Sequence, residues 1–290
     1  MRLYLGGQLS DSIGVTFNTE RTPDGMEVID AIARFEPDEL FNVWAGRLLP
    51  PSDRSNLSGP FFLNAWAFPG LVQRYPNITN GRDDGIAVWG QTGGGTFKYQ
   101  LGAFEGTQGG PNQKDRPMVS GKLVYNFWDP EPGYYNASTY YGARDILAVG
   151  IVGMHQEDAA GTAGASGDFT GGNVELLVEK VLPNTGVATF ETAFYSYDTD
   201  DLAHPNGFTV DGDGYFVLGS YLLPALSDDA PGRFQPMVRY QDFSPSNGAD
   251  ADRLVVGLNY VIDGHNARLS ALYADNDGTD VVLFGAQLQL

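Results

Sequence analysis

Residues 253–262 read RLVVGLNYVI, and apolar side chains occupy every second position along most of this stretch. One face of a strand would carry the apolar residues Leu254, Val256, Leu258, Tyr260 and Ile262. The other face would carry Arg253, Gly257 and Asn259. Side chains alternate between the faces of a strand, whereas an amphipathic helix repeats its apolar positions every three or four residues. The stretch therefore predicts a β-strand of about ten residues with one apolar and one polar face.

The same period recurs along most of the 290-residue chain, for example over 13–17, 97–103 and 282–290. Strand-like segments begin near residues 1, 12, 26, 40, 85, 96, 118, 146, 170, 186, 214, 233, 251, 266 and 280. Patterns typical of helices are nearly absent. We therefore expect residues 1–290 to form a single all-β domain of antiparallel strands.

The composition excludes several classes of protein. The chain has no cysteine, so it forms no disulfide and cannot itself attach a c-type haem. A net charge of −19 without any basic stripe argues against a nucleic-acid partner. No run of about 18 apolar residues predicts a transmembrane helix. No signal peptide is visible, and the first residues, RLYLGGQL, already resemble a strand, which fits a start after a leader or part-way into a fold.

Two architectures bury one face of so many strands: a soluble sandwich or barrel, and a transmembrane barrel with its apolar face toward lipid. The connections alternate in length. The tight set comprises 10–12, 36–39, 93–95, 183–186 and 263–266. The long set comprises 50–84, 106–117, 157–169 and 199–213. Residues 129–145 and 277–279 are exceptions, but short turns on one side and long loops on the other favour an outer-membrane barrel.

The strand count adds an expectation. Bacterial single-chain barrels have even strand numbers, so fifteen segments predict one further strand upstream, which gives about sixteen in all. Residues 50–84 then form the third external loop. Aromatic residues near segment ends, such as Tyr125 and Trp128, suit a lipid interface. We therefore expect contact with a lipid bilayer and with lipopolysaccharide.

The segment GRLLPPSDRSNLSGPFFLNAWAFPG at 46–70 is too apolar for a loop in water and too broken by proline and glycine for a helix or strand. Irregular backbone at membrane depth is tolerated where it is buried in protein or lines a water-filled lumen. We expect residues 50–84 to fold into the barrel and constrict it. The expected constriction residues are Arg47, Asp53, Arg54, Arg74, Arg82, Asp83 and Asp84. The alternative is an ordinary surface loop with its own aromatic cluster.

Strand parity also predicts which charged residues line the lumen. The basic set is Arg34, Lys98, Lys122, Arg239, Arg253 and Arg268. The acidic set is Glu20, Asp30, Glu175, Glu179 and Glu191. A bulge would exchange wall and lumen locally. A lining of mixed sign argues against tight phosphate selection, since selectivity follows the sign of charge in a pore.

Three motifs carry a resemblance to a known family. AGRLLPPSDRSNLSGPFF at 45–62, GRDDGIAVWGQ at 81–91 and FKYQLGAFEG at 97–106 resemble the phosphate-selective porin O and P family of outer-membrane channels. The resemblance implies a sixteen-stranded, often trimeric barrel that passes small anions. It also implies that Arg47, Arg54 and Arg82 support the constriction. The chain departs from the family in having only four lysines, since anion-selective members use a ladder of arginines and lysines.

These patterns predict a porin in the outer membrane of a Gram-negative bacterium, through which small polar or anionic solutes diffuse passively. A homotrimer is what the family resemblance implies. We expect no enzyme activity and no cofactor, because no nucleophile and base occur together. His155, His204 and His265 are isolated, so no metal site is expected. One alternative is a barrel that sheathes a partner cytochrome in an outer-membrane electron conduit. Another is a soluble all-β binding protein.

Overall fold

The computed structural model describes residues 1–74, 81–203, 211–227, 229–276 and 279–289. Within these ranges the strands form one antiparallel sheet in simple chain order from β1 to β15. The strands are β1 (Arg2–Ser10), β2 (Ile13–Thr22), β3 (Gly25–Phe35), β4 (Asn42–Leu48), β5 (Asp83–Thr92), β6 (Phe97–Phe104), β7 (Met118–Asn126), β8 (Ile146–Thr162), β9 (Ala165–Val181), β10 (Val187–Asp198), β11 (Gly212–Leu222), β12 (Arg233–Pro245), β13 (Ala251–Asp263), β14 (Ala267–Asn276) and β15 (Thr279–Leu288). The expected all-β antiparallel fold is confirmed.

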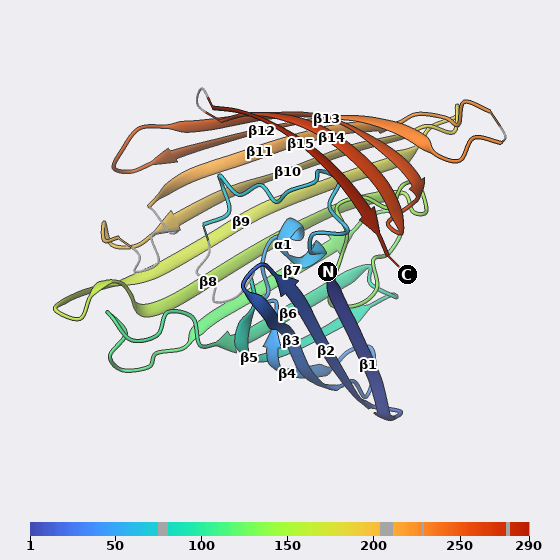
Figure 1. Ribbon diagram of the computed structural model, residues 1–290. Helices are drawn as coiled ribbons and strands as arrows, with labels where there is room; N and C mark the ends of the chain where they lie inside the picture. The colour runs from blue at the N-terminus through green and yellow to red at the C-terminus, as the bar shows by residue number, and fades with distance from the viewer. Residues whose placement is uncertain (75–80, 204–210, 228, 277–278, 290) are drawn as a thin grey trace.

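The sheet curls around the single turn of helix in the described residues, α1 (Arg54–Ser58), as Figure 1 shows. Its two edge strands, β1 and β15, each pair with one neighbour, so the sheet is not closed. No described helix is long or apolar enough to cross a membrane.

The expected long connection at 157–169 is wrong. β8 and β9 are 17 residues each, and the pair Thr162 and Ala165 ends their hairpin. Small residues dominate this stretch, so the sequence lacks the alternation of large apolar and polar side chains that marks a strand. Cross-strand pairs such as Ala160 with Gly167 nevertheless continue the ladder far beyond the neighbouring strands.

The outer face of the sheet is apolar. A row of cross-strand partners runs over β7 to β11 and comprises Leu123, Ile151, Val174, Phe194 and Tyr215. All five side chains are exposed. On β10 the exposed Phe190 and Phe194 alternate with the buried Glu191 and Tyr195. This arrangement is the reverse of a soluble barrel, in which the apolar face would be buried.

A bulge interrupts the alternation on β3. The register between β2 and β3 shifts between Asn18 and Thr19, where Asn18 pairs with Asp30 but Thr19 pairs with Val28. The extra residue, Ile29, and its neighbour Asp30 are therefore both buried. Even-numbered residues of β3 therefore point outward before the bulge, as Val28 does, and inward after it, as Ile32 does.

Candidate functional site

Residues 49–74 lie against the inner face of the sheet, and inward-facing side chains of the wall bind their backbone. Arg239 Nη1 donates to the carbonyl oxygen of Ala67 at 2.6 Å. Arg268 Nη1 donates to that of Leu63 at 2.8 Å. A buried irregular segment needs such partners, because its peptide groups have none within a helix or strand. Charged residues on strands thus satisfy the backbone of this segment, which we call the internal loop.

Two oppositely charged wall residues hold the start of the internal loop. Lys122 on β7 lies 2.7 Å from Glu175 on β9 and donates to the carbonyl of Ser52 at 2.8 Å. Glu175 in turn accepts the backbone N–H of Arg54 at 2.5 Å. The side chain of Asp53, the residue before α1, does not cap the helix. A carboxylate from the wall therefore binds the first free N–H group of the helix, which has no side-chain cap of its own.

Asp53 ties the two ends of the internal loop together. Its carboxylate accepts two hydrogen bonds from Gln73 Nε2, at 2.9 and 2.7 Å, and one from the hydroxyl of Tyr195 at 2.9 Å. Burial raises the pKa of Asp53, and the negative charge of Glu175 acts in the same direction.

A second segment, residues 129–145, also packs on the inner side. Glu131 accepts hydrogen bonds from both Nη atoms of Arg54, at 2.6 and 2.8 Å, and both side chains are fully buried. Burial alone would raise the pKa of Glu131, but the charge and hydrogen bonds of Arg54 hold it at about 2. This bidentate pair joins the second segment to the internal loop.

Further inward charges bind the second segment. Lys98 Nζ donates to the carbonyl of Gly133 at 3.0 Å. Glu191 accepts from the hydroxyl of Ser138 at 3.0 Å, and Glu179 accepts from that of Thr139 at 2.6 Å. Most of the wall residues expected to line a lumen thus contact protein backbone or hydroxyl groups.

The remaining expected site residues lie in different surroundings. Arg47 and Asp84 form a partly exposed bidentate pair with distances of 2.9 and 2.5 Å. Asp83 is buried and accepts the backbone N–H groups of Gly106 and Asp84. The guanidinium of Arg74 lies 4.7 Å from the centre of the Phe243 ring. Arg253 lies half-buried on β13. Residues 75–80 and His204 lie outside the described residues.

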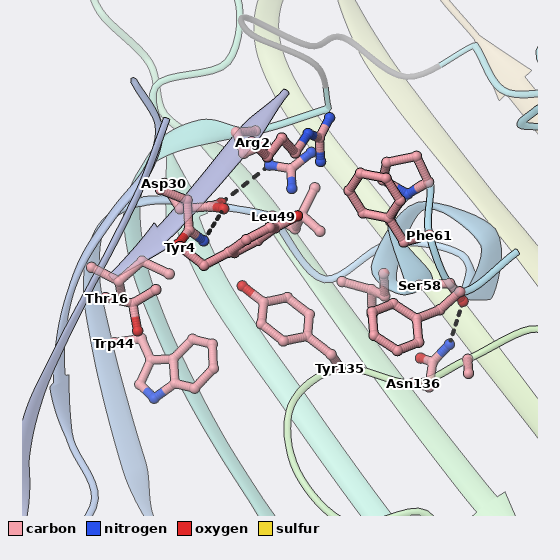
Figure 2. Close-up of a pocket in the computed structure, with 18 of the residues that line it drawn as sticks. Arg2, Tyr4, Thr16, Asp30, Trp44, Leu49, Ser58, Phe61, Tyr135 and Asn136 are labelled. Carbon is pink, nitrogen blue, oxygen red and sulfur yellow. Dashed lines mark hydrogen bonds and ion pairs between the residues drawn. The ribbon is translucent and has the colours of Figure 1, made fainter. Parts of the chain in front are cut away.

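A cavity of about 500 Å³ lies between the tip of the internal loop and the wall formed by β1 to β4 (Figure 2). The wall contributes Arg2, Tyr4, Asn18, Asp30, Arg34 and Trp44. The loop contributes Leu57, Ser58, Phe61 and Phe62. Tyr135 of the second segment also lines it, as does Arg82 immediately before β5. Of the residues singled out from the sequence as constriction or lumen wall, Asp30, Arg34 and Arg82 line this cavity.

Each arginine of the cavity has a carboxylate partner. Arg2 lies 2.9 Å from Glu20, Arg34 lies 3.2 Å from Glu36, and Arg82 lies 3.1 Å from Asp30. The three pairs leave no excess of either charge. This balance weakens the attraction of the cavity for multiply charged ions of either sign.

Two polar atoms of the lining have no hydrogen-bond partner among the described residues. Asn18 donates through Nδ2 to Asp30 at 2.8 Å, but its Oδ1 is buried without a donor. Arg34 Nε is buried without an acceptor. Buried polar atoms normally have a partner, but both atoms are almost entirely shielded from solvent, so neither is presented to a solute in the cavity.

Sequence reasoning missed most of the cavity. The alternation in RLYLGGQL does place Arg2 and Tyr4 on the face opposite Leu3 and Leu5. No local pattern, however, indicates that Phe61, 59 positions further along the chain, would lie near Arg2. Their approach depends on the path of the internal loop. In the described part of the chain, no cluster of three or more His, Cys, Asp or Glu residues could hold a metal ion.

Comparison with known proteins places the fold among outer-membrane barrels. No protein-family model matches the chain, and no curated protein matches its sequence. An anion-selective porin from Comamonas acidovorans superposes with a TM-score of 0.62 at 15% identity, over 99% of this chain and 84% of that one. A loop L8 deletion mutant of OmpT, an outer-membrane protein of Vibrio cholerae, gives 0.61 at 17% identity, over 98% and 88%. The trimer form of OmpT gives 0.54 at 17% identity, over 99% and 86%. At these identities the similarity establishes a shared fold, that of outer-membrane β-barrel proteins.

Proposed function

We propose that the chain is an outer-membrane porin through which small polar or anionic solutes diffuse passively. The observation that carries the proposal is the orientation of the sheet. Its apolar face points outward, and its charged face surrounds an internal loop and a cavity lined by three arginines. An exposed apolar surface that continues over several strands would be covered by lipid in a membrane. The fold shared with an anion-selective porin supports the same reading.

In the proposed channel, the solute passes between the internal loop and the wall of β1 to β4. The buried pairs Arg54 with Glu131 and Lys122 with Glu175 hold the loop away from this wall. Residues 50–84 then constrict the channel, and Arg34 and Arg82 contact the solute through charge-assisted hydrogen bonds. The paired carboxylates prevent a single anion from being trapped there. The paired carboxylates also argue against strict selection of phosphate, although the sequence resembles the phosphate-selective porin O and P family.

The electron-conduit alternative stays a prediction with less support. The internal loop and residues 129–145 occupy the interior, and a haem-bearing segment would need that space. The absence of enzyme activity is likewise an expectation. A homotrimer in the outer membrane remains part of the proposal, and the trimer form of OmpT supports it.

Single-channel recording in planar bilayers tests the proposal. The purified chain should produce stable conductance in KCl, and the reversal potential in asymmetric KCl should show a modest preference for chloride. Arg82→Gln should shift the reversal potential toward potassium, whereas Arg47→Gln, which removes a pair outside the cavity, should leave it unchanged. A preference for potassium in the unmodified protein would overturn the anionic part, and a lack of conductance would overturn the channel.

A further inference from the structure

The cavity lining contains more exposed aromatic surface than a passage for simple ions requires. Phe62 is 40% exposed and Tyr135 is 37% exposed, although both lie on the inner side of the sheet. Figure 2 shows Phe61 and Tyr135 on opposite sides of the space, with Trp44 and Tyr4 along the wall. Apolar surface in contact with water is unfavourable, and a compact ion gains nothing from a ring. The walls therefore suit a solute with an apolar face.

The aromatic wall is rigid. Trp44 stacks on Tyr134 with ring centres 4.7 Å apart and an interplanar angle of 30°, and its Nε1 donates to Glu36 at 3.0 Å. Tyr135 lies 5.6 Å from Trp44. Rings fixed in this way can contact a further ring without losing much conformational freedom. Because Trp44 and Tyr134 are buried, the ring of this wall that a planar aromatic solute would contact is the exposed Tyr135, which packs against Trp44.

The charges at the same cavity favour one negative charge on the solute. The guanidinium of Arg2 lies 5.5 Å from the centre of the Phe61 ring, so a cation and an aromatic face meet at one point of the wall. Guanidinium groups bind carboxylates and sulfonates in planar geometry and also stack on rings. Of the three carboxylates that pair with these arginines, only Asp30 lines the cavity, so the lining attracts an anion, while the pairing weakens the attraction for a second negative charge.

We propose that this cavity binds planar aromatic monoanions, such as ring carboxylates or sulfonates, and passes them in preference to compact anions of equal charge. The proposal rests on the channel function and specifies its substrate class. A volume of about 500 Å³ admits a one- or two-ring molecule. The side chain of Arg34, which is 23% exposed, offers guanidinium N–H groups to the anionic group of the solute.

Bi-ionic reversal potentials in planar bilayers test this proposal, with benzenesulfonate on one side and methanesulfonate on the other. Both ions stay charged near neutral pH, so neither crosses the lipid as a free acid. A simple water-filled pore would favour the smaller methanesulfonate. We expect benzenesulfonate to be the more permeant ion, and millimolar benzenesulfonate to reduce the chloride current in a saturable manner.

The test variant is the double substitution Phe61→Ala and Phe62→Ala. Gln287 binds the backbone carbonyl of Phe61 rather than its ring, so the loop should keep its path. The preference for benzenesulfonate should fall roughly fivefold or more, since the variant removes two aromatic contacts with the solute. The matched control, Phe190→Ala with Phe194→Ala, removes two rings from the outer face of β10 and should retain the preference.

The outcomes separate the substrate class from the channel itself. Conductance in KCl together with greater permeability of methanesulfonate would overturn the substrate class and leave the channel intact. So would a benzenesulfonate preference that survives in the loop variant. Greater permeability of benzyltrimethylammonium than of benzenesulfonate would show recognition of the ring without the anion and overturn the proposal as stated. A complete lack of conductance would overturn the channel, and the substrate class with it.

Discussion

Arg54 and Glu131, 77 positions apart in the chain, form a bidentate ion pair in which both side chains are almost completely buried. One belongs to the internal loop and the other to residues 129–145. The pair connects the two irregular segments inside the sheet. Removing one partner of a buried ion pair lowers the free energy of unfolding far more than replacing both partners by apolar residues.

We expect Glu131→Gln to loosen the internal loop, because it leaves the guanidinium of Arg54 buried without its counter-charge. The local cost should be about 3–5 kcal/mol. Hydrogen exchange of the backbone amides of residues 52–59 should accelerate, and channel recordings should become noisier. Replacing both partners by methionine should recover much of the protection. The partly exposed pair of Arg47 and Asp84 provides the control, since Arg47→Met should cost at most about 1 kcal/mol. Equal exchange rates in Glu131→Gln and the unmodified protein would contradict the role of the pair.

Stability should fall as the pH drops from about 6.5 to about 4, because of His265 in the turn between β13 and β14. Burial lowers the pKa of His265 to about 4, the hydrogen bond to the Thr139 carbonyl opposes this shift, and the charge of Arg268 adds to it. The backbone of Phe61 also favours the protonated ring, so burial is the dominant cause of the lowered pKa of His265.

The direction follows from proton binding. Between the two pKa values the unfolded chain binds the proton more readily than the folded chain, so acid favours unfolding. The stabilisation is complete above about pH 6.5 and amounts to about 3 kcal/mol at most. His265→Gln should flatten the pH dependence of the unfolding free energy in this window, and NMR should detect the imidazole titrating near pH 4. An imidazole that titrates near pH 6.5 in the folded protein would refute the prediction. Glu131 should act in a separate window, since its stabilising charge is lost only as the pH falls from about 4.5 to about 2.

Gly46→Ala should disrupt the pairing of β3 with β4. Gly46 has φ +121°, and a Cβ atom there would lie 2.0 Å from the carbonyl oxygen of Ala31. Both the backbone conformation and the contact exclude a side chain, so we expect a loss of about 2–4 kcal/mol. The urea midpoint of unfolding from lipid vesicles measures the loss. Gly219→Ala on β11 is the control, because a Cβ there would meet no atom within 4 Å. Equal midpoints for the two variants would contradict the close approach at Gly46.

Phe194→Arg should destabilise the protein in a bilayer by about 2–4 kcal/mol, because this exposed side chain belongs to the apolar row that we place against lipid. Asp198→Arg at the exposed end of the same strand should cost about 0–1 kcal/mol. Unfolding from lipid vesicles provides both values. A soluble all-β protein would accept arginine at either position within about 0.5 kcal/mol. Two small values would therefore favour the soluble alternative.

Local period was enough to predict the strands and their two faces. In the stretch 253–262, alternation alone indicates that Leu254 and Leu258 share a face opposite Asn259, and the structure has the two leucines exposed and Asn259 buried. This works because a strand sends successive side chains to opposite faces whatever its partners are. The inward direction of Lys122 and Arg268 was predictable for the same reason.

The partners of those inward charges depended on the tertiary structure. Arg268 binds the carbonyl of Leu63, 205 positions away in the chain, and Arg2 approaches the ring of Phe61. The alternation along a strand shows to which face a side chain points, but not which distant residues lie opposite it. No pattern within a strand could therefore distinguish a charge facing a cavity from one that binds the internal loop. That distinction arose only when the curved sheet brought distant segments together, because each buried peptide group and each buried charge then had to find a partner in space.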